Sequence, residues 1–305
     1  MKILVTGAAG FIGGALARHL TGRGWRVFVD AQRDNAGSTR RWPLTETVLQ
    51  QAMAGEVPDV IVHAAGSGTV AKVAGNPTLE LPANLAAFLA VLDFAAHHAR
   101  QARVLLLSSA ALYGDAPAEP QAEDAVRAPV SLYGLAKLQT EQLANFYAER
   151  DGIASVAIRF FSVYGPGLRK QLLWDAMNKF AAGRSEFFGT GAERRDWVHI
   201  DDVCSFVDHL LARRPRRAFD VYNCAGTPAS TAEVLALLAA AAGAPEPRFN
   251  GQSRAGDPMC LVGDCTKARR ELDWAPRVDW RDGVAGYAAW FASQAGPMSA
   301  REDRA

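Results

Sequence analysis

The chain has 305 residues, 49% of them hydrophobic and 21% charged, which is typical of one large globular α/β domain or a main domain with a smaller one attached. Lys and Arg number 33 against 32 Asp and Glu, so the charge balance gives no support to a nucleic-acid-binding or membrane-surface protein. We find no secretory signal and no uninterrupted apolar stretch of about 18 residues, and expect a cytoplasmic protein without a transmembrane helix. Four cysteines, distant from any histidine cluster, predict neither a disulfide framework nor a metal site.

Apolar runs alternate with helical patterns along the first half of the chain. Short, continuously apolar runs predict strands at residues 2–6, 26–30, 60–63, 104–107 and 155–158. Long alanine- and leucine-containing segments predict helices at residues 77–98 and 131–149. Strands that are apolar on both faces and alternate with helices are typical of a parallel sheet covered on both sides.

The character of the chain changes after Gly165-Pro166-Gly167. The remainder carries more Gly, Pro and Arg, and its predicted elements are shorter. We expect a strand at residues 219–222 and helices near residues 171–182, after Asp201-Asp202, and near 231–242 and 266–272. This part is interpreted as a smaller, partly interleaved second domain.

The segment TGAAGFIG, residues 6–13, lies between the first predicted strand and the first predicted helix, and its glycines are Gly7, Gly10 and Gly13. Such a turn needs one glycine for its backbone angles, a second for close approach of a diphosphate, and a third for packing of the helix on the strand. The helix N-terminus then offers N–H groups and a positive dipole end to the phosphates. The segment therefore predicts a dinucleotide-binding loop rather than an ordinary glycine-rich turn.

Asp30 ends the second predicted strand, 17 residues beyond Gly13. A carboxylate at this position accepts hydrogen bonds from the adenosine ribose hydroxyls and repels a 2′-phosphate, which favours NAD over NADP. Three arginines close downstream could reach such a phosphate, so NADP stays open: Arg33, Arg40 and Arg41.

Tyr133 and Lys137 are four residues apart and share one face of a predicted helix. A fixed ammonium stabilises phenolate, so we expect it to lower the pKa of the tyrosine towards working pH for proton exchange with an alcohol or carbonyl. By itself such a pair is weak evidence, because most lie on solvated helix faces. Ser109, however, ends the preceding strand, where side chains point into the crevice of a parallel sheet. Ser108 is expected only to satisfy backbone groups.

Five motifs follow one another in an order that is typical of one family. They are TGxxGFIG at 6–13, the serine ahead of LYG with YxxxK at 133–137, RFFSVYGPG at 159–167, RRDWVHIDDV at 194–203 and RAGD at 254–257. Together they resemble the extended short-chain dehydrogenase/reductase family, in its nucleotide-sugar epimerase/dehydratase branch. The resemblance spans nearly the whole chain and implies a Rossmann-type doubly wound parallel sheet with a smaller C-terminal substrate-binding domain.

This fold implies domain boundaries and a ligand. We expect a Rossmann domain at residues 1–164, with 196–224 returning to it, a substrate-binding domain at 165–195 and 225–295, and a tail at 296–305. The implied ligand is a nucleotide diphosphate sugar in the cleft between the two domains. The resemblance also implies that the helices at 77–98 and 131–149 could pair across a homodimer.

The resemblance assigns roles to the residues that match the family motifs. The implied catalytic residues are Ser109, Tyr133 and Lys137. The implied dinucleotide contacts are Gly7, Gly10, Phe11, Ile12, Gly13, Asp30, Tyr133, Lys137 and Phe161. The implied substrate contacts are Ser109, Ser162, Arg195 and Arg254, the two arginines being suited to hold a diphosphate.

Several of these motif residues also have a purely structural interpretation. Arg195 and Asp196 could form a surface ion pair, and Asp201-Asp202 a helix N-cap. Asn84 could face the ligand or bond only within its own helix. Ser162 stands where most relatives have asparagine.

The residues after Ser109 narrow the reaction. Relatives that eliminate water place Asp-Glu there, whereas this chain has Ala110 and Ala111, whose methyl groups cannot transfer protons. We therefore expect an NAD-dependent nucleotide-sugar 4-epimerase and disfavour a dehydratase. A nucleotide-4-keto-sugar reductase is the alternative, since the short segment between residues 30 and 60 resembles such reductases. A non-catalytic dinucleotide-sensing protein is a remote one.

Overall fold

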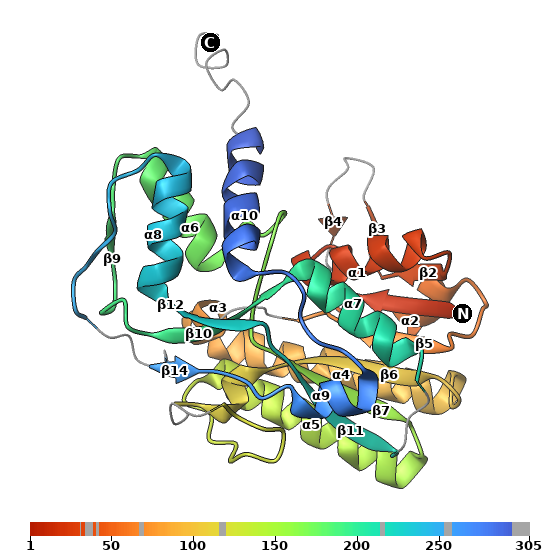
Figure 1. Cartoon of the computed structure of the whole chain (residues 1–305). Helices are drawn as coiled ribbons and strands as arrows, with labels where there is room; N and C mark the ends of the chain where they lie inside the picture. Colours follow the sequence, from red (N-terminus) through yellow and green to blue (C-terminus); the bar gives the residue numbers. More distant parts are fainter. Residues whose placement is uncertain are drawn as a thin grey trace.

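A six-stranded parallel sheet forms the centre of the molecule (Figure 1). The computed structural model describes residues 1–30, 32–33, 39–40, 43–66, 70–115, 120–213, 217–252 and 258–294. The strand order is β11-β7-β6-β5-β1-β2, and every neighbouring pair is parallel. The strands are β1 (Lys2–Thr6), β2 (Arg26–Val29), β5 (Val60–His63), β6 (Arg103–Ser109), β7 (Ser155–Phe160) and β11 (Phe219–Cys224). The predicted fold class is confirmed.

Helices cover both faces of this sheet, because alternate residues of each strand are apolar on opposite sides. Ile3 and Val5 of β1 share one core with Leu16 and Leu20 of α1, whereas Leu4 belongs to the core on the other face. The first face carries α1 (Phe11–Gly22), α7 (Ile200–Leu211) and α9 (Thr266–Leu272). The second carries α2 (Glu46–Met53), α4 (Pro77–His98) and α5 (Leu132–Asp151), with α3 (Val70–Gly75) packed on α4 and α5.

Among the described residues the sheet ends at β2, which agrees with the absence of a clear third strand in the sequence between residues 30 and 60. Two short strands, β3 (Gln32–Arg33) and β4 (Thr39–Arg40), pair only with each other. The tail at 296–305 lies outside the described residues.

A second group of elements has its own core, made where α6 (Gln171–Ala181), α8 (Thr231–Ala242) and α10 (Trp280–Gln294) meet. In Figure 1 these three helices stand together at one end of the central sheet. A small sheet lies beneath them, built from β8 (Ser162–Tyr164), β10 (Arg194–His199), β12 (Thr227–Ser230) and β14 (Cys260–Leu261), and β9 (Glu186–Phe187) pairs with β13 (Arg248–Phe249). The residue boundaries that we predicted for the two domains stay a prediction.

The start of α7 differs from the sequence-based expectation. We expected Asp201-Asp202 to cap this helix, but its N-cap is His199, whose Nδ1 accepts a hydrogen bond from the N–H of Asp201 at 3.3 Å. Asp202 instead accepts hydrogen bonds from the N–H groups of Arg277 and Val278, at 2.9 and 3.1 Å. The buried carboxylate of Asp202 therefore binds the backbone at Arg277 and Val278, 75 and 76 residues further along the chain.

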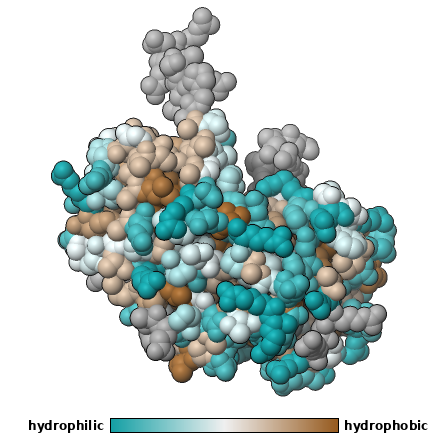
Figure 2. Space-filling model, in the orientation of Figure 1, coloured by the Kyte–Doolittle hydropathy of each residue, from teal (hydrophilic) through white to brown (hydrophobic). Residues whose placement is uncertain are grey.

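Helix α4 has the predicted bounds and is long and apolar. Among the described residues it is the one helix long and apolar enough to cross a membrane by length and composition, and 28% of its most apolar stretch is buried. A helix that covers a buried sheet passes the same test, and α4 contributes Phe88, Val91 and Leu92 to the core beneath the sheet. On the face shown in Figure 2, hydrophobic residues form small separate spots among hydrophilic ones.

Candidate active site

The glycine loop between β1 and α1 is closed in a way that only glycine permits. Gly7 has a φ of +72°, and a Cβ there would lie 2.5 Å from the backbone N of Ala65. A Cβ on Gly13 would lie 2.4 Å from the carbonyl oxygen of Gly7, so α1 packs directly against the turn. The helix N-cap, Gly10, provides no side-chain cap. The N–H groups of the first turn are therefore available to an anion.

Asp30 lies at the carboxyl end of β2 and is directed at this loop. Its two carboxylate oxygens accept hydrogen bonds from the N–H of Gly7 at 2.9 and 3.0 Å. Burial raises the pKa of Asp30, against the lowering effect of these backbone hydrogen bonds. The carboxylate thus fixes the turn and stands beside the loop, as its predicted role requires. Arg41 and the side chains of Arg33 and Arg40 lie outside the described residues.

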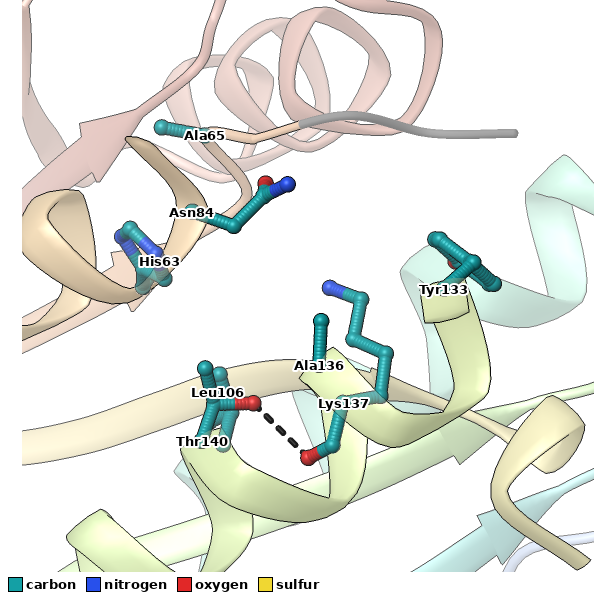
Figure 3. A pocket seen from close by; sticks show the side chains of 8 residues that line it. All are labelled: His63, Ala65, Asn84, Leu106, Tyr133, Ala136, Lys137 and Thr140. Carbon is teal, nitrogen blue, oxygen red and sulfur yellow. Dashed lines mark hydrogen bonds between the residues drawn. The ribbon is translucent and has the colours of Figure 1, made fainter. Parts of the chain in front are cut away.

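A pocket opens at the carboxyl ends of β5 and β6, next to the glycine loop (Figure 3). Lys137 reaches into it from α5, and the dashed line in Figure 3 joins the Thr140 hydroxyl to the Lys137 carbonyl oxygen. The Lys137 Nζ donates a hydrogen bond to the carbonyl oxygen of Leu107 at 2.7 Å. Asn84 of α4 and His63 of β5 face the ammonium from the opposite wall (Figure 3). The full lining is His63, Ala65, Asn84, Leu106, Tyr133, Ala136, Lys137 and Thr140.

Ser109 and Tyr133 meet at this place, as predicted from their positions in the sequence. Ser109 is the last residue of β6, and its hydroxyl oxygen accepts a hydrogen bond from the N–H of Ala111 at 3.2 Å. The same hydroxyl lies close enough to Tyr133 to lower the pKa of the phenol. Helix α5 brings Tyr133 here because Ser131 caps its N-terminus, accepting a hydrogen bond from the N–H of Gly134 at 3.1 Å. A Cβ on Gly134 would lie 2.4 Å from the carbonyl oxygen of Ala111, so the helix start packs directly against the turn that follows β6.

The pKa values in the pocket reflect burial more than charge. Burial lowers the pKa of Lys137 to about 8, against the raising effect of Glu141. Burial raises the pKa of Tyr133, and the nearby Ser109 hydroxyl only partly opposes this. The expected lowering of the tyrosine pKa by the ammonium is therefore wrong for the protein without its ligands. The Lys137 Nζ lies over the Tyr133 ring, 5.9 Å from its centroid, and is bonded to the backbone.

His63 is a pocket residue that the sequence analysis overlooked. Its Nδ1 is hydrogen-bonded to Thr6 Oγ1 at 2.9 Å, and burial together with the Lys137 charge lowers its pKa to about 3. The ring is neutral at any working pH and links the ends of β1 and β5. The signal was present, because a polar residue that ends a buried strand has the same meaning at His63 as at Ser109.

A buried ionic network lies directly behind Ser109. Ser108 donates a hydrogen bond to Glu141 Oε1 at 2.6 Å, and Arg159 of β7 donates to both oxygens of Glu141 at 3.0 and 2.8 Å. Arg159 also donates to the hydroxyl of Tyr113, which donates to Asn223 of β11. Ser108 thus bonds to a side chain, and the expectation that it serves only backbone groups is wrong.

The remaining predicted contacts lie around the pocket rather than in it. Phe161 is buried and stacks on Tyr113, with ring centroids 6.3 Å apart. Ser162 and Arg195 lie on the small sheet, where β8 and β10 pair, and Arg195 Nη1 donates to the carbonyl oxygen of Arg194 at 2.9 Å. Arg254 lies outside the described residues.

Two structural alternatives are resolved by the geometry. Asp196 is buried and accepts a hydrogen bond from the N–H of Gly263 at 2.9 Å, so it does not form the surface ion pair with Arg195. Asn84 does both things that the sequence left open. Its Nδ2 donates to the carbonyl oxygen of Glu80 in the same helix at 2.7 Å, and the residue also lines the pocket.

Comparison with known proteins places the chain in a family. Residues 3–225 match the model of the NAD dependent epimerase/dehydratase family. The chain belongs to this family. Because the match runs from β1 through β11, it includes the glycine loop, the pocket and the network behind it.

The relatives carry out more than one reaction. The UDP-glucose 4-epimerase of Azospirillum brasilense is 30% identical over 93% of this chain and 89% of its own length. The dTDP-glucose 4,6-dehydratase of Streptomyces griseus is also 30% identical, over 95% of this chain and 93% of its own. The UDP-glucose 4-epimerase of Thermotoga maritima, solved with UDP-glucose, is 25% identical with a TM-score of 0.85 and covers 96% of this chain and 99% of its own. Overall similarity alone does not separate epimerase from dehydratase.

Proposed function

We propose that this chain is an NAD-dependent nucleotide-sugar 4-epimerase, which oxidises C4 of the sugar transiently and returns the hydride to the other face. The observation that carries the proposal is the grouping of Ser109 and Tyr133 beside the buried ammonium of Lys137. These three groups come together at the carboxyl ends of the strands, where ligands of doubly wound folds bind. The epimerases among the relatives support the same reaction.

The residues around the glycine loop fit a dinucleotide. No side chain other than hydrogen fits at Gly7 or Gly13, so the turn packs tightly against α1 and the end of β5. The first turn of α1 has no side-chain cap, which leaves its N–H groups to a diphosphate. Asp30 would hold the adenosine ribose and favours NAD, and Lys137 would hold the nicotinamide ribose. The other proposed cofactor contacts are Gly10, Phe11, Ile12, Tyr133 and Phe161. NAD, when bound, supplies the acceptor and donor of the hydride.

Tyr133 would transfer the proton of the C4 hydroxyl group, and Ser109 would hydrogen-bond the same oxygen as it becomes a carbonyl. Because burial raises the pKa of Tyr133, the phenol needs help to act as a base. The ammonium of Lys137 is the positive charge that the chain places beside it. When the hydride returns, the same tyrosine would give the proton back to the sugar oxygen.

The turn after Ser109 supports redox chemistry without elimination. Ala110 and Ala111 open the 3₁₀ helix η1 (Ala110–Tyr113), and Ala110 is fully buried. Neither methyl group can donate or accept a proton, and among the residues that line the pocket the proton-transferring candidates are Tyr133, Lys137 and His63. A pKa of about 3 makes His63 a poor general acid.

The substrate we propose is a nucleotide diphosphate sugar, bound towards the small sheet. Ser162 and Arg195 lie on that side, and Arg254 matches a second arginine for the diphosphate. A homodimer through α4 and α5 and a cytoplasmic location stay predictions.

One observation favours a second candidate, an NAD(P)H-dependent nucleotide-4-keto-sugar reductase. In the described part of the segment between residues 30 and 60, no strand is added to the central sheet, and this compactness is the feature in which the chain resembles such reductases. The two enzymes would use the same residues and differ in whether the cofactor leaves after each turnover.

The deciding experiment identifies the cofactor that copurifies with the protein and then offers UDP-, dTDP-, GDP- and CDP-sugars. Products are followed by NMR and the nicotinamide by absorbance. Retained NAD and a C4 epimer without net reduction support the epimerase. Stoichiometric oxidation of added NAD(P)H on a 4-keto sugar supports the reductase, and loss of water from the sugar contradicts both.

Tyr133→Phe tests the mechanism. We expect turnover to fall by at least about 100-fold, the usual contribution of a positioned general acid–base group, while NAD binding measured by fluorescence titration persists. Unchanged turnover would overturn the assigned role. Binding of NAD without turnover of any sugar by the unaltered enzyme would point instead to the dinucleotide-sensing alternative.

A further inference from the structure

Three side chains that could ligate a metal converge where α2 meets α4, away from the pocket. Glu46 is the first residue of α2, and His97 and His98 are the last two residues of α4. Glu46 Oε2 lies 2.9 Å from His97 Nδ1 and 3.5 Å from His98 Nε2. Among the described residues this is the one group of three such side chains whose ligand atoms all lie within 4.8 Å of one another.

These separations are close to those of a metal site. With metal–nitrogen and metal–oxygen bonds of about 2.1 Å, neighbouring ligands of a tetrahedral ion are roughly 3.4 Å apart. The two measured distances to Glu46 Oε2 bracket that value. The two imidazole planes are nearly perpendicular, at 84°, and their ligand nitrogens lie within 4.8 Å of each other. Binding of a tetrahedral ion would draw the two nitrogens together around the Glu46 carboxylate.

The surroundings also favour a cation. Gln50, one turn after Glu46 on α2, has its amide nitrogen 2.7 Å from His98 Nε2, and rotation of the amide would offer an oxygen instead. Glu46 raises the pKa of His97, and Asp93 and Asp151 add smaller contributions of the same sign. Glu46 is thus the main negative charge facing His97, since Asp151 is itself paired with Arg150.

We propose that Glu46, His97 and His98 bind one divalent transition-metal ion of the Zn²⁺ class and thereby tie α2 to α4. Two imidazoles and one carboxylate suit Zn²⁺, Ni²⁺ and Co²⁺ better than Mg²⁺ or Ca²⁺, which prefer oxygen ligands. The expectation of no metal site rested on the cysteines and on sequence proximity. It could not include Glu46, which is 51 residues away from His97 and is brought to it only by helix packing.

The site is independent of the proposed sugar chemistry. Helix α4 ends shortly before β6 begins, so His97 and His98 lie near the amino ends of the strands. His63 and Ser109 lie at the carboxyl ends of the strands, on the opposite side of the sheet from these histidines. The metal would act on the structure by clamping a short helix of eight residues to a long one.

The test titrates untagged, chelator-treated protein, with its cofactor retained, using ZnCl₂ in an isothermal titration calorimeter. We expect one Zn²⁺ per chain and an upward shift of the thermal midpoint at saturation. The same protein with Co²⁺ should develop the visible absorption of a low-symmetry site with nitrogen and oxygen ligands. Glu46→Gln and His98→Ala should each weaken Zn²⁺ binding about tenfold or more, since even indirect ligand contacts contribute that much.

His19→Ala is the matched control, because His19 forms another partly exposed pair with a carboxylate, Asp208 at 2.8 Å, but has no third ligand. Its Zn²⁺ affinity should equal that of the unaltered protein. Absence of stoichiometric uptake by the unaltered protein would overturn the proposal, as would uptake that survives simultaneous replacement of Glu46, His97 and His98. Neither result depends on whether the enzyme turns over a sugar.

Discussion

At the scale of single residues, burial decides what each polar group can do. Ser108 and Ser109 are neighbours on β6 and contact different parts of α5. The first reaches Glu141, and the second reaches Tyr133. The sequence was sufficient to select Ser109, because it ends the strand. It was not sufficient to find the partner of Ser108 or the raised pKa of Tyr133, because both depend on packing between segments.

Lys137 should set an alkaline limit to activity. Its pKa is lowered by burial to about 8, so the ammonium is present below that pH and is lost above it. We expect kcat/KM, which reports ionisations of the free enzyme, to fall about tenfold per pH unit above this value. In Lys137→Arg the side chain stays charged over the whole pH range of the assay. Its kcat/KM should be lower but should not fall above about pH 8. If kcat/KM of Lys137→Arg falls at the same alkaline pH as that of the unaltered enzyme, the ionising group is not Lys137.

At the scale of elements, the sequence predicted those whose pattern is set locally. The strands of the central sheet carry continuous apolar runs, and residues 77–98 form α4 with the predicted bounds. The short strands of the small sheet were not predicted. Strands such as β12 and β14 have four and two residues, which are too few to show the alternation of apolar and polar residues typical of a strand. They form because they pair with β10. Likewise, the sequence could not show that Asp202 bonds to residues 277 and 278 and that His199 caps α7 instead.

The turn between β1 and α1 can be tested with two alanine substitutions in the same helix. Gly13→Ala would place a methyl group 2.4 Å from the Gly7 carbonyl oxygen, so the helix must move off the turn. We expect NAD affinity to fall by about tenfold or more, measured by fluorescence titration. Gly22→Ala is the control, because a Cβ there meets nothing within 4 Å. It should leave NAD affinity unchanged and add up to ~1 kcal/mol of stability. Equal affinities for NAD in the two variants would contradict the packing argument.

At the scale of the whole molecule, buried polar groups join segments that are far apart in sequence. Glu141 and Arg159 form a salt bridge whose side chains are 2% and 1% exposed, and Arg159 continues through Tyr113 to Asn223. The network spans α5, β7, η1 and β11. The sequence could supply the charged residues but not their connection, since an arginine in a buried strand gives no sign of which acid will neutralise it.

Glu141→Gln should destabilise the protein by about 3 kcal/mol, because it leaves the Arg159 charge buried without a partner. The free energy of unfolding is measured by urea denaturation. Glu149→Gln on the same helix serves as the control, since that exposed side chain accepts a hydrogen bond from Asn145 at 2.9 Å, and loss of its charge should cost under about 0.5 kcal/mol. Similar values for the two variants would show that the buried pair contributes little.

The place of β11 has a consequence for how the protein is made. β11 pairs with β7 along all six of its residues, yet it is separated from β7 by the segment that contains α6, β9, β10 and α7. During synthesis from the N-terminus, the other five strands of the central sheet emerge before β11. The free edge of β7 stays unpaired until the chain has been made as far as residue 224. An unpaired edge strand invites association with other chains. A nascent chain truncated at residue 164 would therefore expose that edge, and we expect such a fragment to aggregate when it is produced by itself.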